Sequence, residues 1–99
     1  MLSLTANTTR GGNMICRIYD VDGATLEQYD EVDQKFPDMP DGGRCHIAGM
    51  LDGRLQVIEV WDSREQLEAF EEKLGPAMQE ANVPNPKVTE FEVHNFESA

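Results

Sequence analysis

The sequence predicts a ferredoxin-like βαββαβ domain of the α+β class, a four-stranded antiparallel sheet (order 4-1-3-2) with two helices on one face. One indication is the alternation of strand-like and helix-like patterns along the chain. Another is a weak internal repeat, since Ile18-Tyr19-Asp20 and Val60-Trp61-Asp62 each precede a helix start. Two such strand–helix units, joined by right-handed crossovers, give this topology.

The first half of the chain contains one predicted strand and one predicted helix. Residues 14–19 are rich in β-branched and aromatic side chains, which favour a strand, and Asp22-Gly23 follows as a turn. Residues 25–28 have the capping-box pattern of a helix start. Apolar residues then recur at helical spacing up to Phe36, and Pro37 is expected to end the helix.

The second half contains a hairpin, a helix and a last strand. Residues 44–50 and 55–61 are predicted strands joined at Asp52-Gly53, a two-residue type I′ turn. Residues 63–66 form a second capping box that opens a helix over 64–81. Gly75-Pro76 is expected to break or kink this helix, and residues 88–96 form the last strand.

The chain is long enough for one domain. Residues 1–13 are polar, lack sustained periodicity and are expected to form a flexible N-terminal arm. The domain is therefore predicted to span residues 14–99, beginning at Met14. Cys16 and Cys45 lie in apolar strand patterns and are predicted to be buried, reduced thiols.

The net charge of −11 and the pI of about 4.3 argue against nucleic acid and against an anionic membrane as partners. The whole of this charge lies in residues 20–41 and 62–80, the predicted helical layers and their loops. No apolar run reaches transmembrane length, and the N-terminus lacks the pattern of a signal peptide. A cytoplasmic protein is expected.

A two-residue turn at Asp52-Gly53 would set the register of the hairpin, with His46 opposite Glu59 and Arg44 opposite Trp61. Directly opposed residues share a face of the sheet. One face is then small and aliphatic, and we expect it to lie under the helices. It carries Met14, Cys16, Ile18, Cys45, Ile47, Ile58, Val60, Thr89, Phe91 and Val93.

The opposite face mixes ionisable and apolar side chains, and we expect no helix to cover it. It carries Arg17, Tyr19, His46, Met50, Leu55, Val57, Glu59, Trp61, Glu92 and His94. Because exposed apolar patches usually mark an interface or a binding site, we expect a homodimer. Its two sheets would close around a partly polar cavity that takes a hydrophobic or aromatic small molecule.

The junction Val60-Trp61-Asp62-Ser63, with Phe70 downstream, is similar to the Trp-x-Ser strand-to-helix junction of the dimeric α/β-barrel superfamily. Within it the chain resembles the small antibiotic biosynthesis monooxygenase-like proteins, over residues 14–96. The resemblance implies a face-to-face homodimer. Some members oxygenate aromatic substrates without a cofactor, and others bind haem, isomerise or cyclise small molecules, or have no known activity. The haem-degrading branch uses a helix histidine, which the second predicted helix lacks, so no cofactor is expected.

His46 and Glu59 are the sharpest candidates for chemistry. A carboxylate that orients an imidazole would make His46 a general base or donor near neutral pH. The alternative is a cross-strand charge pair without catalytic function. Arg17 and Tyr19 point the same way and could hold a substrate carboxylate or enolate oxygen. Alternatively, Arg17 forms a salt bridge with Glu59 or Glu92 across the dimer.

The remaining candidates shape the pocket. Trp61, with Met50, Leu55 and Val57, would line it, or Trp61 would anchor the dimer with Arg44 stacked on its ring. His94 is a rim residue, or it completes a metal site with His46 across the dimer, which spacing within one chain does not support. The sequence thus predicts acid/base chemistry of a monooxygenase, isomerase or cyclase kind, with no metal. The alternative is a non-catalytic ligand-binding or structural dimer.

Overall fold

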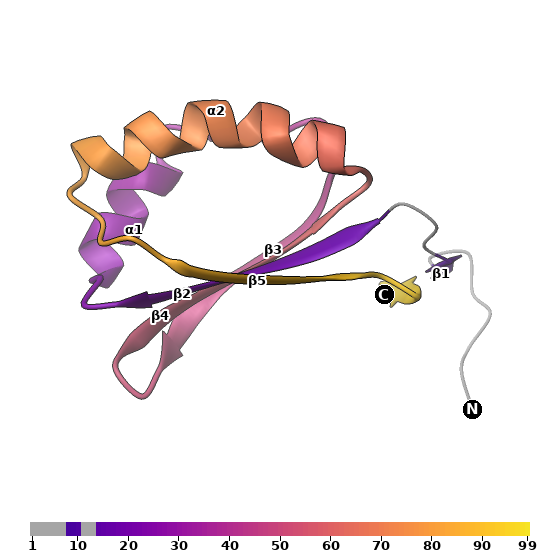
Figure 1. Ribbon diagram of the computed structural model, residues 1–99, viewed down its shortest axis with the longest axis horizontal. Coiled ribbons are helices and arrows are strands. Elements are labelled where there is room, and N and C mark those ends of the chain that lie inside the picture. The colour runs from indigo at the N-terminus through magenta and orange to yellow at the C-terminus, as the bar shows by residue number, and fades with distance from the viewer. Residues whose placement is uncertain (1–7, 11–13) are drawn as a thin grey trace.

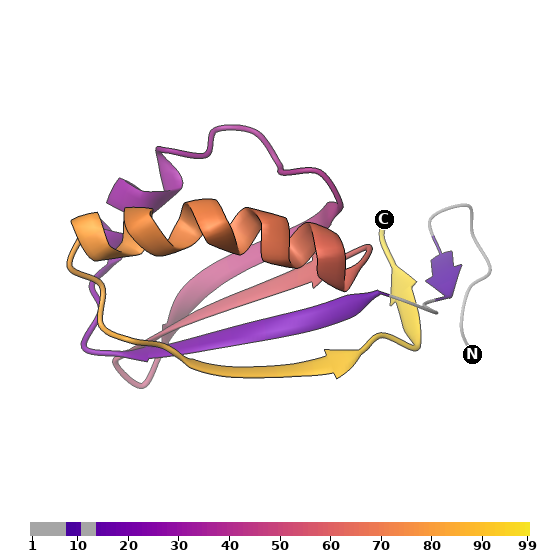
Figure 2. The same cartoon turned by 45° about the horizontal axis from the view of Figure 1, so that its top comes forward.

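The four-stranded sheet and its two helices have the predicted order (Figure 1). The computed structural model describes residues 8–10 and 14–99. The sheet order is β3-β4-β2-β5, antiparallel throughout, and both helices lie on one face (Figures 1 and 2). The main elements are β2 (Ile15–Asp22), α1 (Leu26–Asp33), β3 (Gly43–Leu51), β4 (Arg54–Trp61), α2 (Arg64–Glu80) and β5 (Lys87–Glu92). The predicted fold class is confirmed.

A second, small sheet pairs the two ends of the chain. Its strands are β1 (Thr8–Arg10) and β6 (Asn95–Glu97), which run antiparallel. Residues 8–10 of the predicted arm form this strand; the rest of the predicted arm lies outside the described residues. The last predicted strand is also divided, because it is interrupted at Val93 and His94 between β5 and β6.

The β3–β4 hairpin has the predicted turn and most of the predicted register. Asp52 and Gly53 both have positive φ, 51° and 77°, as a type I′ turn requires. His46 lies opposite Glu59, but a bulge between Gly43 and Cys45 places Gly43 opposite Trp61. The predicted stacking of Arg44 on Trp61 is wrong: Arg44 instead pairs with Asp62 at 2.6 Å.

The helices begin where the sequence predicts and end differently. In α1, Thr25 accepts a hydrogen bond from the Gln28 amide and Gln28 Oε1 accepts one from the Thr25 amide, which completes the capping box. The helix ends at Asp33, before the residues whose conformation Pro37 restricts. The second helix has Ser63 at its N-cap and continues through Pro76, so the break expected there is wrong.

Replacing Thr25 with alanine is expected to lower the free energy of unfolding by about 1 kcal/mol, because the amide of Gln28 at the start of α1 loses the hydroxyl that accepts its hydrogen bond. Urea denaturation of both proteins measures the difference. Thr25→Ser keeps a hydroxyl acceptor and should retain most of the stability; equal losses in both variants would contradict the capping role.

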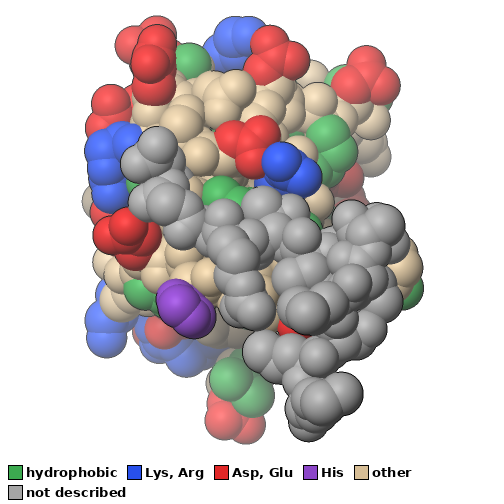
Figure 3. Space-filling view, turned by 90° about the vertical axis from the view of Figure 1, so that its right-hand side faces the viewer, with side chains coloured by type: hydrophobic (Ala, Val, Ile, Leu, Met, Phe, Trp, Pro, Cys, Tyr) green, Lys and Arg blue, Asp and Glu red, His purple; other side chains and the backbone are tan. Residues whose placement is uncertain are grey.

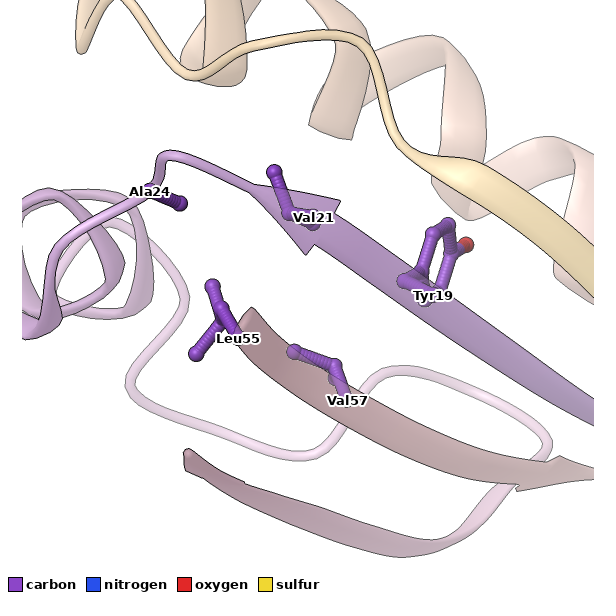
Figure 4. Close-up of a cluster of buried hydrophobic side chains, with 5 residues drawn as sticks. All are labelled: Tyr19, Val21, Ala24, Leu55 and Val57. Carbon is purple, nitrogen blue, oxygen red and sulfur yellow. The ribbon is translucent and has the colours of Figure 1, made fainter. Parts of the chain in front are cut away.

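The helices cover the face that the sequence analysis left open. Figure 4 shows one buried cluster on this face, formed by Tyr19 and Val21 of β2, Ala24, and Leu55 and Val57 of β4. Tyr29 of α1 and Leu74 of α2 pack against this cluster. A second cluster on the same face joins Ile15, Trp61 and Leu67, with Phe70 against it. The assignment of the aliphatic face to the helices is therefore wrong.

The aliphatic face of the sheet is the one without a helix among the described residues. Side chains of adjacent strands share it in rows, for example Ile47, Ile58 and Ile18. Ile47 and Phe91 are 56% and 55% exposed. We call the set Cys16, Ile18, Cys45, Ile47, Ile58, Val60, Thr89 and Phe91 the open sheet face.

Figure 3 shows one end of the molecule, where acidic and basic side chains are interspersed. The visible charged side chains do not gather into a patch of one sign. Within the described residues, neither helix is long and apolar enough to cross a membrane.

Candidate active site

A cavity of about 270 Å³ lies between the helix-covered face of the sheet, the two helices and the loop that follows α1. Strands β2 and β4 supply one wall, with Tyr19, Val57 and Trp61 among its residues. Other walls come from Tyr29 of α1 and Phe70 of α2. Several residues that were expected to line a cavity between two subunits thus line a cavity within one chain.

A hydrogen-bonded row of four side chains crosses the wall of this cavity. Trp61 Nε1 donates to Glu59 Oε1 at 3.1 Å, and Glu59 Oε2 lies 3.2 Å from His46 Nδ1. His46 Nε2 is in turn 2.5 Å from the hydroxyl of Tyr29, whose ring stacks against the imidazole. The strands fix this row, because His46 and Glu59 are directly opposed in the hairpin.

The chemistry of each group sets the proton positions in this row. A carboxylate can only accept, so Nδ1 of His46 carries a hydrogen and donates it to Glu59. Burial, together with Asp33, raises the pKa of Tyr29 to about 12, so its hydroxyl keeps its hydrogen. In neutral His46 the lone pair is then on Nε2, where it accepts from Tyr29. This is the arrangement of a general base oriented by a carboxylate.

The hydrogen bond to Glu59 raises the pKa of His46 above its ordinary value of 6.5, and burial only partly opposes this. Because the pKa of His46 is higher in the folded state than in the unfolded state, protonation of His46 stabilises the fold. This stabilisation is complete at a pH below the unfolded pKa, and it is lost as the pH rises through the folded pKa. The charges of Glu59 and Asp33 both act on the imidazole.

The stability advantage of the parent over His46→Gln is therefore expected to shrink as pH rises from about 6 to about 9. Chemical denaturation of both proteins across this range measures it. His94→Gln is the control, because His94 is exposed. A difference between parent and His46→Gln that does not change with pH would contradict the pairing of His46 with Glu59.

Tyr19 borders the cavity, and burial raises its pKa to about 12, with a further contribution from the charge of Glu59. Its hydroxyl is buried and has no hydrogen-bond partner among the described residues. Arg17, predicted to work with it, is turned to other partners: Glu71 of α2 at 2.5 Å and Glu90 of β5 at 2.9 Å. The guanidinium lies 6.0 Å from the centre of the Tyr19 ring.

The structure brings together only part of the predicted site. Leu55, Val57 and Trp61 are buried and line the cavity. Met50 is 43% exposed and lies outside the described cavity wall, as does His94, which is exposed beyond the end of β5. Trp61 is 2% exposed under the helices, so it is not a dimer anchor.

Two of the alternatives above involve Arg17 and His46 in contacts across a dimer. Arg17 forms its salt bridges within the chain, with Glu71 and Glu90. His46 Nε2 contacts the hydroxyl of Tyr29 within the chain. Among the described residues, no group of three or more histidine, cysteine, aspartate or glutamate side chains could hold a metal ion.

Tyr29 was not among the predicted site residues, because it belongs to the apolar spacing of the first predicted helix. A tyrosine on an apolar helix face needs a partner for its hydroxyl when it is buried, and that requirement was the available signal. Asp33, one helical turn further along, also lines the cavity.

The helix-backed sheet and its internal cavity define the class, a ferredoxin-like α+β domain, and a solved structure shares this fold. That structure is a candidate antibiotic biosynthesis monooxygenase from Chloroflexus aurantiacus J-10-fl, similar with a TM-score of 0.65. The identity is 16%, over 81% of this chain and 92% of that chain. No family model matches the chain, and no curated protein matches it. The likeness therefore confirms the predicted fold.

Proposed function

We propose that the protein binds a small hydrophobic or aromatic molecule in its cavity and transfers a proton with His46 as acid/base. The observation that supports this most is the row Trp61–Glu59–His46–Tyr29 in the wall of a largely apolar cavity. Ionisable side chains inside an apolar cavity are typical of functional sites. The alternative is a binding protein of the same fold without catalysis.

The row provides a path for one proton. A carbon acid bound against Tyr29 gives its proton to the Tyr29 oxygen while the Tyr29 hydrogen passes to His46 Nε2. The products are a ligand carbanion, neutral Tyr29 and an imidazolium that Glu59 stabilises at Nδ1. Trp61 holds Glu59 in place through its Nε1–H. Arg17, bound by two carboxylates, has a positioning role beside the Tyr19 ring.

Such a step suits each reaction type that the resemblance implies. A carbanion can be reprotonated at another carbon, attack a carbonyl group or react with dioxygen, which correspond to isomerisation, cyclisation and oxygenation. The Chloroflexus protein of the same fold is a candidate monooxygenase. That likeness supports oxygenation, but it leaves isomerisation and cyclisation open.

We also propose that two chains form a homodimer through the open sheet face. This face is apolar, and Ile47 and Phe91, on its edge strands β3 and β5, are more than half exposed in a single chain. A second copy of the same face would cover it, and two-fold contacts of this kind are the commonest in soluble oligomers. Cys16 and Cys45, both free thiols, fit a reducing, cytoplasmic setting.

Proton transfer can be tested with 2-tetralone, an uncharged bicyclic ketone with an acidic carbon next to its carbonyl. The protein is expected to accelerate exchange of this proton for deuterium in heavy water, followed by proton NMR. His46→Gln should lose the acceleration, because glutamine has no basic nitrogen, and should still bind the ketone. His94→Gln is the control and should behave as the parent.

Amide NMR spectra during the same titration locate the ligand. Shifts should concentrate at cavity residues such as Val57 and Leu74 and leave Ile47 unchanged. Binding without accelerated exchange would favour the non-catalytic alternative. Absence of binding would overturn the proposal.

A further inference from the structure

The cavity lining carries negative charge and no cationic side chain other than histidine. Among the described lining residues are three carboxylates, Asp33, Asp38 and Glu59, and neither lysine nor arginine. Glu59 pairs with His46. Asp33 and Asp38 belong to none of the ion pairs of the described residues, and both are exposed. They therefore lie at the rim, where the cavity meets solvent.

Two features of α1 add to this negative rim. Asp33 is the last residue of the helix, whose C-terminal end carries partial negative charge. No basic residue occupies the last turn of α1. Lys35 follows it, but its ammonium is 2.6 Å from Glu80 of α2 and so is already paired. The negative charge at the rim is left without a neighbouring lysine to balance it.

Behind the rim, aromatic rings form much of the cavity wall. Phe36 and Phe70 meet edge to face with their centres 5.0 Å apart, and Trp61 lies 5.3 Å from Phe70. Tyr19 and Tyr29 add two further rings to the wall. Such rings bury an apolar ligand body, and their faces attract an organic cation.

We infer that the cavity selects an aromatic amine in its protonated form, with the ring against Phe36, Phe70 and Trp61 and the ammonium between Asp33 and Asp38. This inference rests on the proposed function and names the charge of its ligand. A volume of about 270 Å³ is near the lower end of ligand pockets and suits one or two fused rings. A carboxylate or phosphate at the rim would meet only like charge.

Three naphthalene probes of the same ring test the charge: 2-naphthylmethylamine, 2-naphthylmethanol and 2-naphthoate. Calorimetry at low salt is expected to show the amine binding about tenfold tighter than the alcohol. The carboxylate is expected to bind at least about tenfold more weakly than the alcohol. Added salt should narrow both differences, since the rim is exposed.

The double variant Asp33→Asn and Asp38→Asn should bring the amine to within about threefold of the alcohol and leave the alcohol unchanged. The control is Glu31→Gln with Asp41→Asn, which removes two exposed charges outside the described cavity wall, one on α1 and one on the following loop. This control should keep the preference for the amine. Thermal unfolding verifies that both variants fold.

The outcomes separate this inference from the proposed function. If the alcohol and the amine bind equally in the parent, or the control variant loses the preference as well, the inference is overturned and the cavity remains a binding site. If none of the three probes binds, the proposed function fails and the inference fails with it. A preference for the amine that disappears only in the Asp33/Asp38 variant supports it.

Discussion

Replacing Ile47 with arginine is expected to convert the proposed homodimer into a monomer. Ile47 lies on the open sheet face, opposite Ile58, and is 56% exposed in the single chain. In a dimer closed through this face it would be covered by the partner. A buried guanidinium without a counter-charge would then cost several kcal/mol, enough to dissociate the subunits at micromolar concentration.

Light scattering after size-exclusion chromatography measures the mass of each protein. Leu26→Arg is the matched control, because Leu26 is 53% exposed but lies on α1, on the other side of the sheet. It should remain dimeric. A monomeric parent, or an Ile47→Arg variant that stays dimeric, would contradict a dimer formed through the open sheet face.

The sequence was sufficient to predict which strand residues share a face, but not which face the helices cover. The turn at Asp52-Gly53 sets the register, and alternation then groups Ile47 with Ile58 and His46 with Glu59. Both resulting faces are apolar in large part, so hydrophobicity did not distinguish the face that the helices cover from the open sheet face. The larger side chains, Trp61 among them, lie under the helices because two helices above a sheet supply the surface that buries them.

The candidate site was predictable to the same extent. The cross-strand pair of His46 and Glu59 followed from register alone. Tyr29 did not, because its contact with His46 joins a helix to an edge strand and depends on how the helix packs. The bulge that releases Arg44 from Trp61 is a further case: an extra residue in one strand leaves no sign in the alternation pattern.

Replacing Glu59 with glutamine is expected to abolish proton transfer while the protein remains folded. Trp61 Nε1–H is buried and can only donate, so the glutamine must offer it the amide oxygen. The amide NH₂ then faces His46 Nδ1, which has to accept. The hydrogen of the imidazole moves to Nε2, where it is donated to Tyr29, and the basic lone pair is lost from that position.

This exchange of tautomers predicts different effects on activity and stability. The acceleration of deuterium exchange should fall by about 10²-fold or more, the usual contribution of a general base. The free energy of unfolding should change by less than about 1.5 kcal/mol, because the hydrogen bond from Trp61 is kept and the two hydrogen bonds of His46 are kept in the reversed direction. Glu59→Ala, in contrast, leaves Trp61 Nε1 unpaired and opens a void, at a cost of about 3 kcal/mol.

Nitrogen-15 NMR of the imidazole groups tests the cause directly. In the parent, neutral His46 should carry its hydrogen on Nδ1, and in Glu59→Gln it should carry it on Nε2. His94 is an internal control, since it is exposed and distant from the row, so its spectrum should be the same in both proteins. If the tautomer changes and activity does not, His46 is not the base. If activity is lost with the tautomer unchanged, the charge of Glu59 matters more than the orientation it imposes.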